Sequence, residues 1–216
     1  MKLNVLKTKV YLISPGTGKY LDRLNVVFGR LVKYGFFNIE FVRSVPDVSS
    51  TNSLSLTNLE ILKKEMDSDK PFIIFEDDIE FSRHITEIDV PDDASAVYLG
   101  VSKWVYPHPY DTLLKPNFQI IENNICNIKD YDDDLTQIAG VTSTHGILFK
   151  DRKYIRKFID NMQPVMERCV AHDLVFATIH QEYTVYALKD PIVYQDAAIG
   201  GQEEATRLTY NGVNYC

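Results

Sequence analysis

The residues with the clearest chemical potential are three successive acids, Glu76, Asp77 and Asp78, in the sequence PFIIFEDDIEF. Apolar residues precede and follow them, so core positions flank the acids on both sides. Adjacent carboxylates repel one another and raise each other's pKa unless a cation compensates. Carboxylate oxygens are hard ligands that favour Mg²⁺ or Mn²⁺, and such ions commonly bridge protein carboxylates to a diphosphate. The triplet predicts a metal and phosphate site, with a solvated acidic turn as the alternative.

The position of the triplet relative to its neighbours strengthens the site interpretation. The run Phe72–Phe75 is continuously apolar, which is typical of a strand buried on both faces of a parallel sheet. Ligands of open α/β sheets bind beyond the carboxyl ends of such strands, where the acids lie. A second acidic run, Asp132–Asp134, follows a polar segment without such a strand, so we interpret it as a solvated loop.

The elements that must position the acids alternate between strands and helices. The spacing of Thr57 and Glu60 matches a capping box at the start of one of the helices. This alternation predicts a doubly wound α/β layer, with a mixed central sheet flanked by helices. The predicted strands are 9–13, 36–42, 72–75, 96–99, 145–149, 183–188 and 192–194, and the predicted helices are 21–32, 56–66, 154–162 and 172–180.

Composition limits the classes of partner. The chain has 216 residues, 45% apolar and 25% charged, which suits one sizeable globular domain over 1–216. Its formal charge of −7 argues against a general nucleic-acid binder, which needs a basic face. A bound divalent cation would still allow phosphate-bearing small molecules.

Cysteine usage and hydropathy predict the compartment. The three cysteines, Cys126, Cys169 and Cys216, are far apart and form no CxxC pair, which disfavours thiolate zinc sites and a disulfide framework. No apolar run approaches the ~20 residues that span a bilayer, and the N-terminus lacks the features of a signal peptide. We therefore expect a soluble protein of the cytoplasm without a membrane span.

The strand that ends in Glu-Asp-Asp resembles a known class. An N-terminal strand and turn, followed by a buried strand ending in these acids, resembles the GT-A class of glycosyltransferases. The segment FIIFEDDIEF is similar to the Ile-Leu-Glu-Asp-Asp segment of lipopolysaccharide-type glycosyltransferases. The length and the style of the segments resemble the N-terminal domain of multidomain chlorovirus glycosyltransferases that decorate a capsid glycan. The resemblance implies a GT-A (nucleotide-diphospho-sugar transferase, Rossmann-like) fold, and further domains in a larger viral chain, acting in the host cytoplasm.

The resemblance also implies a division of labour in a transferase that uses a UDP-sugar and a glycan acceptor. Asp78 would bind Mn²⁺ or Mg²⁺, and Glu76 and Asp77 would face the ribose or the metal through water. The metal would stabilise the departing nucleoside diphosphate. In the first turn, Ser14, Gly16 and Thr17 would lie against the base. The nucleotide would occupy roughly residues 1–100, and the acceptor roughly residues 101–216.

A late carboxylate is a candidate catalytic base. Asp173 resembles the acid that inverting GT-A enzymes use to take the acceptor proton, a function that requires hydrogen-bond reach of the hydroxyl. The alternative is an N-cap at a helix start, where Asp is favoured. In a retaining enzyme Asp173 would instead orient the sugar.

Three further segments are candidates for contact with sugars or metal. His145, in Thr142–Gly146, is a candidate sugar contact, with a satisfied structural histidine as the alternative. Trp104 and Tyr106 lie in an aromatic segment that would serve as an acceptor platform or anchor a loop. Gln195-Asp196 occupies the place where many GT-A enzymes have a further metal ligand, usually His, so diphosphate and water would complete the metal shell here.

Three other functions were weighed, and two of them remain as alternatives. Gly18-Lys19 suggests a P-loop, but Ile13 and Tyr20 occupy positions where that motif requires Gly and Ser or Thr. A nucleotidyltransferase that makes nucleotide sugars would need a basic loop after the first strand, where this chain has Lys19 and Arg23. A non-catalytic sugar-nucleotide or glycan-binding module is the second remaining alternative.

Overall fold

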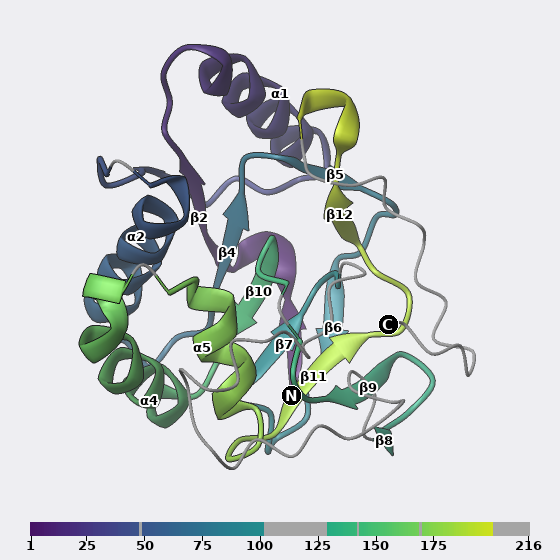
Figure 1. Cartoon of the computed structure of the whole chain (residues 1–216). Coiled ribbons are helices and arrows are strands. Elements are labelled where there is room, and N and C mark those ends of the chain that lie inside the picture. The colour runs from purple at the N-terminus through teal and green to yellow at the C-terminus, as the bar shows by residue number, and fades with distance from the viewer. Residues whose placement is uncertain (48, 102–128, 142, 169, 201–216) are drawn as a thin grey trace.

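The apolar run before the acidic triplet forms a buried central strand, β4 (Phe72–Glu76), in the computed structural model (Figure 1). The structure describes residues 1–47, 49–101, 129–141, 143–168 and 170–200. β4 pairs parallel with β2 (Lys9–Ser14) and antiparallel with β10 (Gly146–Phe149). Both faces of β4 are covered, which explains why its sequence shows no alternation of apolar and polar residues.

In the described residues, eight strands form the central sheet, in the order β3-β2-β4-β10-β7-β11-β9-β8. The first three are mutually parallel, β10 runs against both of its neighbours, and β11 is parallel to β7. Strands from both halves of the chain thus share one sheet. The fold class expected from the sequence, α/β with a mixed central sheet flanked by helices, is confirmed. The other strands of the sheet are β3 (Ile39–Arg43), β7 (Ala96–Tyr98), β8 (Lys129–Asp130), β9 (Leu135–Ile138) and β11 (Val185–Leu188).

Helices cover both faces of this sheet. On one face, Val27 and Leu31 of α1 (Lys19–Lys33) belong to the same buried cluster as Leu12 and Phe75. The other face is covered by three helices that lie together in Figure 1: α2 (Ser50–Lys64), α4 (Arg152–Met162) and α5 (His172–Ile179). Within the described ranges, no helix is long and apolar enough to cross a membrane.

Two short ribbons extend the sheet. β1 (Lys2–Asn4) pairs with β6 (Glu87–Asp89), and β5 (Ile79–Phe81) pairs with β12 (Val193–Gln195). Gly100 allows β12 to approach, because a Cβ at this position would lie 1.9 Å from the Val193 carbonyl oxygen. Short 3₁₀ turns complete the fold: η1 (Val5–Lys7), η2 (Gln163–Arg168) and η3 (Ala197–Ile199).

The starts of α2 and β3 differ most from those predicted. α2 begins at Ser50 and is capped by the Ser49 side chain, so the predicted capping box at Thr57 is wrong. The Thr57 hydroxyl instead donates to the Ser53 carbonyl within the helix, at 2.7 Å. β3 starts later than expected. The backbone amide of buried Phe36 donates to the Leu31 carbonyl, so Phe36 belongs to the C-terminal turn of α1 and not to the strand.

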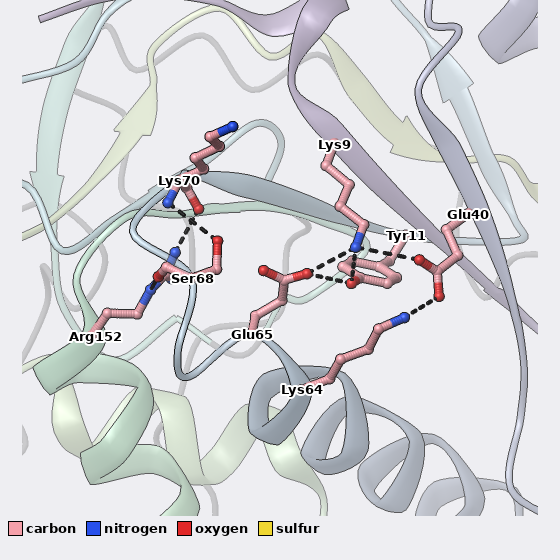
Figure 2. Close-up of polar contacts among 8 residues, drawn as sticks. All are labelled: Lys9, Tyr11, Glu40, Lys64, Glu65, Ser68, Lys70 and Arg152. Carbon is pink, nitrogen blue, oxygen red and sulfur yellow. Dashed lines mark hydrogen bonds and ion pairs between the residues drawn. The ribbon is translucent and has the colours of Figure 1, made fainter.

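A polar network joins the start of β2 to the end of α2 (Figure 2). The Lys9 ammonium lies 2.9 Å from Glu65 Oε1 and 3.3 Å from Glu40 Oε2, and the buried Tyr11 hydroxyl donates to Glu65. Lys64 adds a second ion pair with Glu40, at 2.5 Å. These contacts fasten α2 to β2 and β3 at the end of the parallel strands opposite to the acidic triplet.

Candidate functional site

The acidic triplet lies where two adjacent parallel strands end. Glu76 is the last residue of β4, and Asp77 and Asp78 form the turn into β5. Ser14 is the last residue of β2, and its hydroxyl donates a hydrogen bond to Asp77 Oδ2. Parallel strands bring their carboxyl ends to one edge, so residues 63 positions apart in sequence are brought into contact.

The two aspartates share one arginine from α1. Arg23 Nη2 lies 3.2 Å from Asp77 Oδ1 and 3.0 Å from Asp78 Oδ2, and all three side chains are largely buried. Burial raises the pKa of Asp77, against the opposing effects of the Ser14 hydrogen bond and Arg23. Burial also raises the pKa of Asp78, with Arg23 opposing and Asp77 adding to the increase. One guanidinium therefore compensates these two acids incompletely.

The β5–β12 ribbon places a third segment against Asp78. The Asp196 amide donates to the Asp78 carbonyl at 2.7 Å, and Gln195 Nε2 lies 3.4 Å from Asp78 Oδ2. The segment that the sequence analysis compared with a metal-ligand position thus lies beside the acid expected to bind metal. The group that this segment directs at the Asp78 carboxylate is the side-chain amide of Gln195.

Glu76 faces a different set of groups. Thr144 Oγ1 donates to Glu76 Oε1 at 2.8 Å. Burial raises the pKa of Glu76 to about 8, with the charge of Asp78 adding, Thr144 opposing, and the charges of Asp173 and Asp77 adding smaller amounts. Asp173 is therefore close enough to interact electrostatically with the triplet. The site combines four carboxyl groups, drawn from β4, the turn after it and α5.

Asp173 lies in the first turn of α5 and is not its N-cap, which is Ala171. The N-cap alternative considered for Asp173 is therefore wrong, although Oδ1 does accept a hydrogen bond from the Leu174 amide at 2.8 Å. Burial raises the pKa of Asp173 to about 6, with backbone hydrogen bonds opposing. A carboxyl group with a pKa near neutrality can exchange a proton at ordinary pH.

The first turn brings Ser14 and Gly16 to the site and leaves Thr17 exposed. The Gly16 amide donates to Ser14 Oγ at 3.1 Å, which orients the hydroxyl toward Asp77. Gly16 has a φ of 63°, and a Cβ there would lie 2.9 Å from the ring of Phe41. The backbone conformation therefore favours glycine, whereas the exposed Phe41 ring can shift to make room for a Cβ.

The remaining candidate residues are divided between the core and the part of the chain that is not described. His145 is buried, its Nδ1 lies 3.0 Å from Ser143 Oγ, and burial lowers its pKa to about 4. Its Nε2 is buried and has no hydrogen-bond partner among the described residues, so the ring is not fully satisfied, and its role as a sugar contact stays a prediction. Trp104 and Tyr106 lie outside the described residues, as does Thr142.

The fit of a divalent cation rests on one atom. Asp78 Oδ1 is buried and has no hydrogen-bond partner in the part of the chain that the structure describes, and a carboxylate oxygen suits Mg²⁺ or Mn²⁺. In the described parts of the chain, no group of three or more His, Cys, Asp or Glu side chains is arranged to hold a metal. Asp78 therefore offers one protein ligand, and diphosphate and water would supply the others.

Sequence reasoning missed Arg23 as part of the site. It was considered as a loop cation for a triphosphate, whereas the structure directs it into the acids. The acidity of the triplet could have predicted this residue, because buried acids require a cation. Arg23 was a candidate because it lies on the helix that follows the neighbouring strand. Thr144 was within a segment already singled out, but its partner Glu76 was not foreseen.

Comparisons with known proteins give only distant likenesses. No protein-family model matches the sequence, and no curated protein matches it. One similar solved structure is a nucleoside-diphosphate-sugar pyrophosphorylase from Vibrio cholerae RC9, with 13% identity, a TM-score of 0.41, and coverage of 85% of this chain and 73% of that one. Another is the CTP:phosphocholine cytidylyltransferase of Streptococcus pneumoniae, with 12% identity, a TM-score of 0.41, and coverage of 89% and 95%. Neither likeness says which reaction this chain catalyses.

Proposed function

We propose that this chain is a GT-A-type glycosyltransferase that moves a sugar from a UDP-sugar to a glycan acceptor and requires Mn²⁺ or Mg²⁺. The observation that carries the proposal is the site at the ends of β2 and β4. There, Glu76, Asp77 and Asp78 gather beside Ser14, and Arg23 pairs with the two aspartates. An acid-rich, largely buried site at the carboxyl ends of parallel strands suits a cation with a phosphate-bearing ligand.

The donor would bind across the first turn and the triplet. Asp78 holds the cation through its unpartnered oxygen, and Asp77 is kept in place by the Ser14 hydroxyl. Gly16 and Thr17 lie along the nucleotide, and Glu76 contacts the ribose or the metal through water. The bound cation stabilises the negative charge of the departing nucleoside diphosphate.

Asp173 would act on the acceptor. Its charge contributes to the raised pKa of Glu76, which supports a position near the donor, and its own raised pKa, about 6, suits a group that accepts a proton near neutral pH. In an inverting enzyme Asp173 takes the acceptor hydroxyl proton, and in a retaining enzyme it orients the sugar. We also propose that residues 1–216 form a single domain and that Trp104 and Tyr106 form part of the acceptor site. The protein would act in the cytoplasm, which for a viral protein is the cytoplasm of the host.

A nucleotidyltransferase that makes nucleotide sugars is the second candidate, and Arg23 favours it. Such an enzyme needs a cation after its first strand to hold a triphosphate, and Arg23 reaches the site from α1. The two functions differ in the bond that breaks: the sugar–diphosphate bond in a glycosyltransferase, and the bond between the α- and β-phosphates of a nucleoside triphosphate in a nucleotidyltransferase.

Calorimetry followed by turnover tests these functions. We expect UDP to bind in the presence of Mn²⁺ and to lose most of its affinity in EDTA. A panel of UDP-sugars with Mn²⁺ should then release UDP, by hydrolysis or by transfer to added sugars. Release of pyrophosphate from UTP and a sugar 1-phosphate would favour the nucleotidyltransferase. Binding of UDP-sugars without turnover would favour a non-catalytic module, and no binding at all would contradict all three functions.

A further inference from the structure

Arg23 occupies the place between Asp77 and Asp78 where a cation is needed. Its Nη2 is the atom that contacts both carboxylates, and its side chain is 13% exposed, against 9% for Asp77 and 8% for Asp78. In the largely buried site, one positive charge thus faces two negative charges, with Glu76 close by. The single arginine therefore does not balance the charge of the acids around it.

The pairing is also incomplete in its hydrogen bonds. Arg23 Nε and Asp78 Oδ1 are both buried and have no hydrogen-bond partner among the described residues. A buried polar atom that lacks a partner costs free energy, and more so when it belongs to a charged group. The site therefore contains a buried carboxylate oxygen, on Asp78, and a guanidinium N–H, on Arg23, that are both available to a ligand.

A second arginine on the same helix also faces two acids, but the hydrogen bonds of that group are more complete. Arg30, seven residues after Arg23, lies 2.7 Å from Asp196 Oδ2 and 2.8 Å from Glu80 Oε2. Its Nη1 also donates to the Ile79 carbonyl at 2.8 Å. The second oxygens of both acids accept backbone amides, those of Phe81 and Ala198. Arg30 thus fixes the β5–β12 ribbon to α1.

We propose that Arg23 is an exchangeable counter-ion, which pairs Asp77 and Asp78 until a divalent cation displaces it and then binds the phosphates of the donor. The inference rests on the proposed function and adds a residue to the donor site. A guanidinium binds phosphate oxygens through two parallel N–H groups, so the displaced group has a partner in the same ligand. The Tyr20 ring, 5.3 Å from the Arg23 guanidinium carbon, provides a face on which the released side chain can rest.

The test compares Mn²⁺ binding, without nucleotide, to the wild-type protein and to Arg23→Met, with Arg30→Met as the matched control. Methionine keeps much of the aliphatic volume and removes the competing charge. We expect Arg23→Met to bind Mn²⁺ about tenfold more tightly than wild type, a change within the usual range of coupling between two ligands. We also expect Mn²⁺ to raise the melting temperature of Arg23→Met more than that of wild type or Arg30→Met. With Mn²⁺ saturating, Arg23→Met should bind UDP more weakly than wild type.

Equal or weaker Mn²⁺ binding by Arg23→Met, with wild type binding normally, would overturn the exchange and leave the metal-dependent function standing. Failure of both proteins to bind Mn²⁺ would overturn the exchange together with the metal requirement of the proposed function. If Arg23→Met does not fold, Arg23→Gln provides the comparison, since it removes the competing charge but keeps an amide that can donate to the carboxylates. Its Mn²⁺ affinity should then exceed that of wild type, and an unchanged or lower affinity would again overturn the exchange.

Discussion

β2 has a polar cluster at each end, and the two clusters differ in how completely their charges are paired. At its start, Lys9 and Lys64 face Glu40 and Glu65, so cations and acids are equal in number. At its end, beyond Ser14, a single Arg23 faces Asp77 and Asp78. The first cluster is complete within the protein, whereas the second has an excess of acid.

The pKa values of the acids at the two ends shift in opposite directions, although burial favours a higher pKa at both. Burial opposes ionisation of Glu65, but hydrogen bonds from Tyr11 and Lys9 outweigh it, and the pKa of Glu65 is lowered. Burial prevails at Asp77 and Asp78, and their pKa values are raised. A buried carboxylate that is fully paired with cations and donors of the protein stabilises the fold. A buried carboxylate that lacks such pairing is suited to a ligand that brings positive charge.

The largest expected effect is at the acid-rich end. Asp78→Asn removes the charge that would hold the cation, and we expect turnover of the UDP-sugar with Mn²⁺ to fall by about 100-fold or more. Folding should be retained, because the change relieves repulsion with Asp77. Turnover and urea unfolding of the variant measure the two effects, and Glu40→Gln, at the other end of β2, is the control with unchanged turnover. Full turnover by Asp78→Asn would contradict the assignment of this end as the ligand site.

A smaller effect, on stability alone, is expected at the balanced end. Glu65→Gln weakens the hydrogen bonds from the Tyr11 hydroxyl and from Lys9, and should reduce the free energy of unfolding by about 1–3 kcal/mol. Turnover should not change, because the cluster lies at the far end of the strand from the triplet. Urea unfolding and a turnover assay on the same preparation test both statements. A variant with wild-type stability would show that the network is dispensable.

The smallest expected effect is the pH dependence of that same contribution. The pKa of Glu65 in the folded protein is below its ordinary value of 4.5, so the unfolded chain binds more protons between the two values. The stability that Glu65 provides is therefore fully present above about pH 5.5 and is lost as the pH falls through its folded pKa. Unfolding of wild type and Glu65→Gln at a series of pH values should show a constant difference near neutrality that shrinks in acid. A difference that grows in acid would contradict the ionised state assigned to Glu65.

Much of the fold was predictable because its elements are locally encoded. The apolar run 72–75, the turn after residue 13 and the helical spacing after residue 20 each specified an element that the structure contains. The start of α2 was not predicted, because several Ser and Thr residues there have similar capping potential. Ser49 is the cap that the contacts of the folded chain select.

The sequence by itself determined that three acids follow a buried central strand, because four consecutive apolar residues can be buried on both faces only inside a sheet. The resemblance to GT-A enzymes assigned Ser14 and Gly16 to the nucleotide base and Gln195 to the place of a further metal ligand. Only the tertiary structure decided which charges meet. Arg23 lies more than fifty residues before Asp77, and Thr144 comes 68 residues after Glu76. Contacts of this kind depend on sheet order and helix orientation, which no local pattern of residues records.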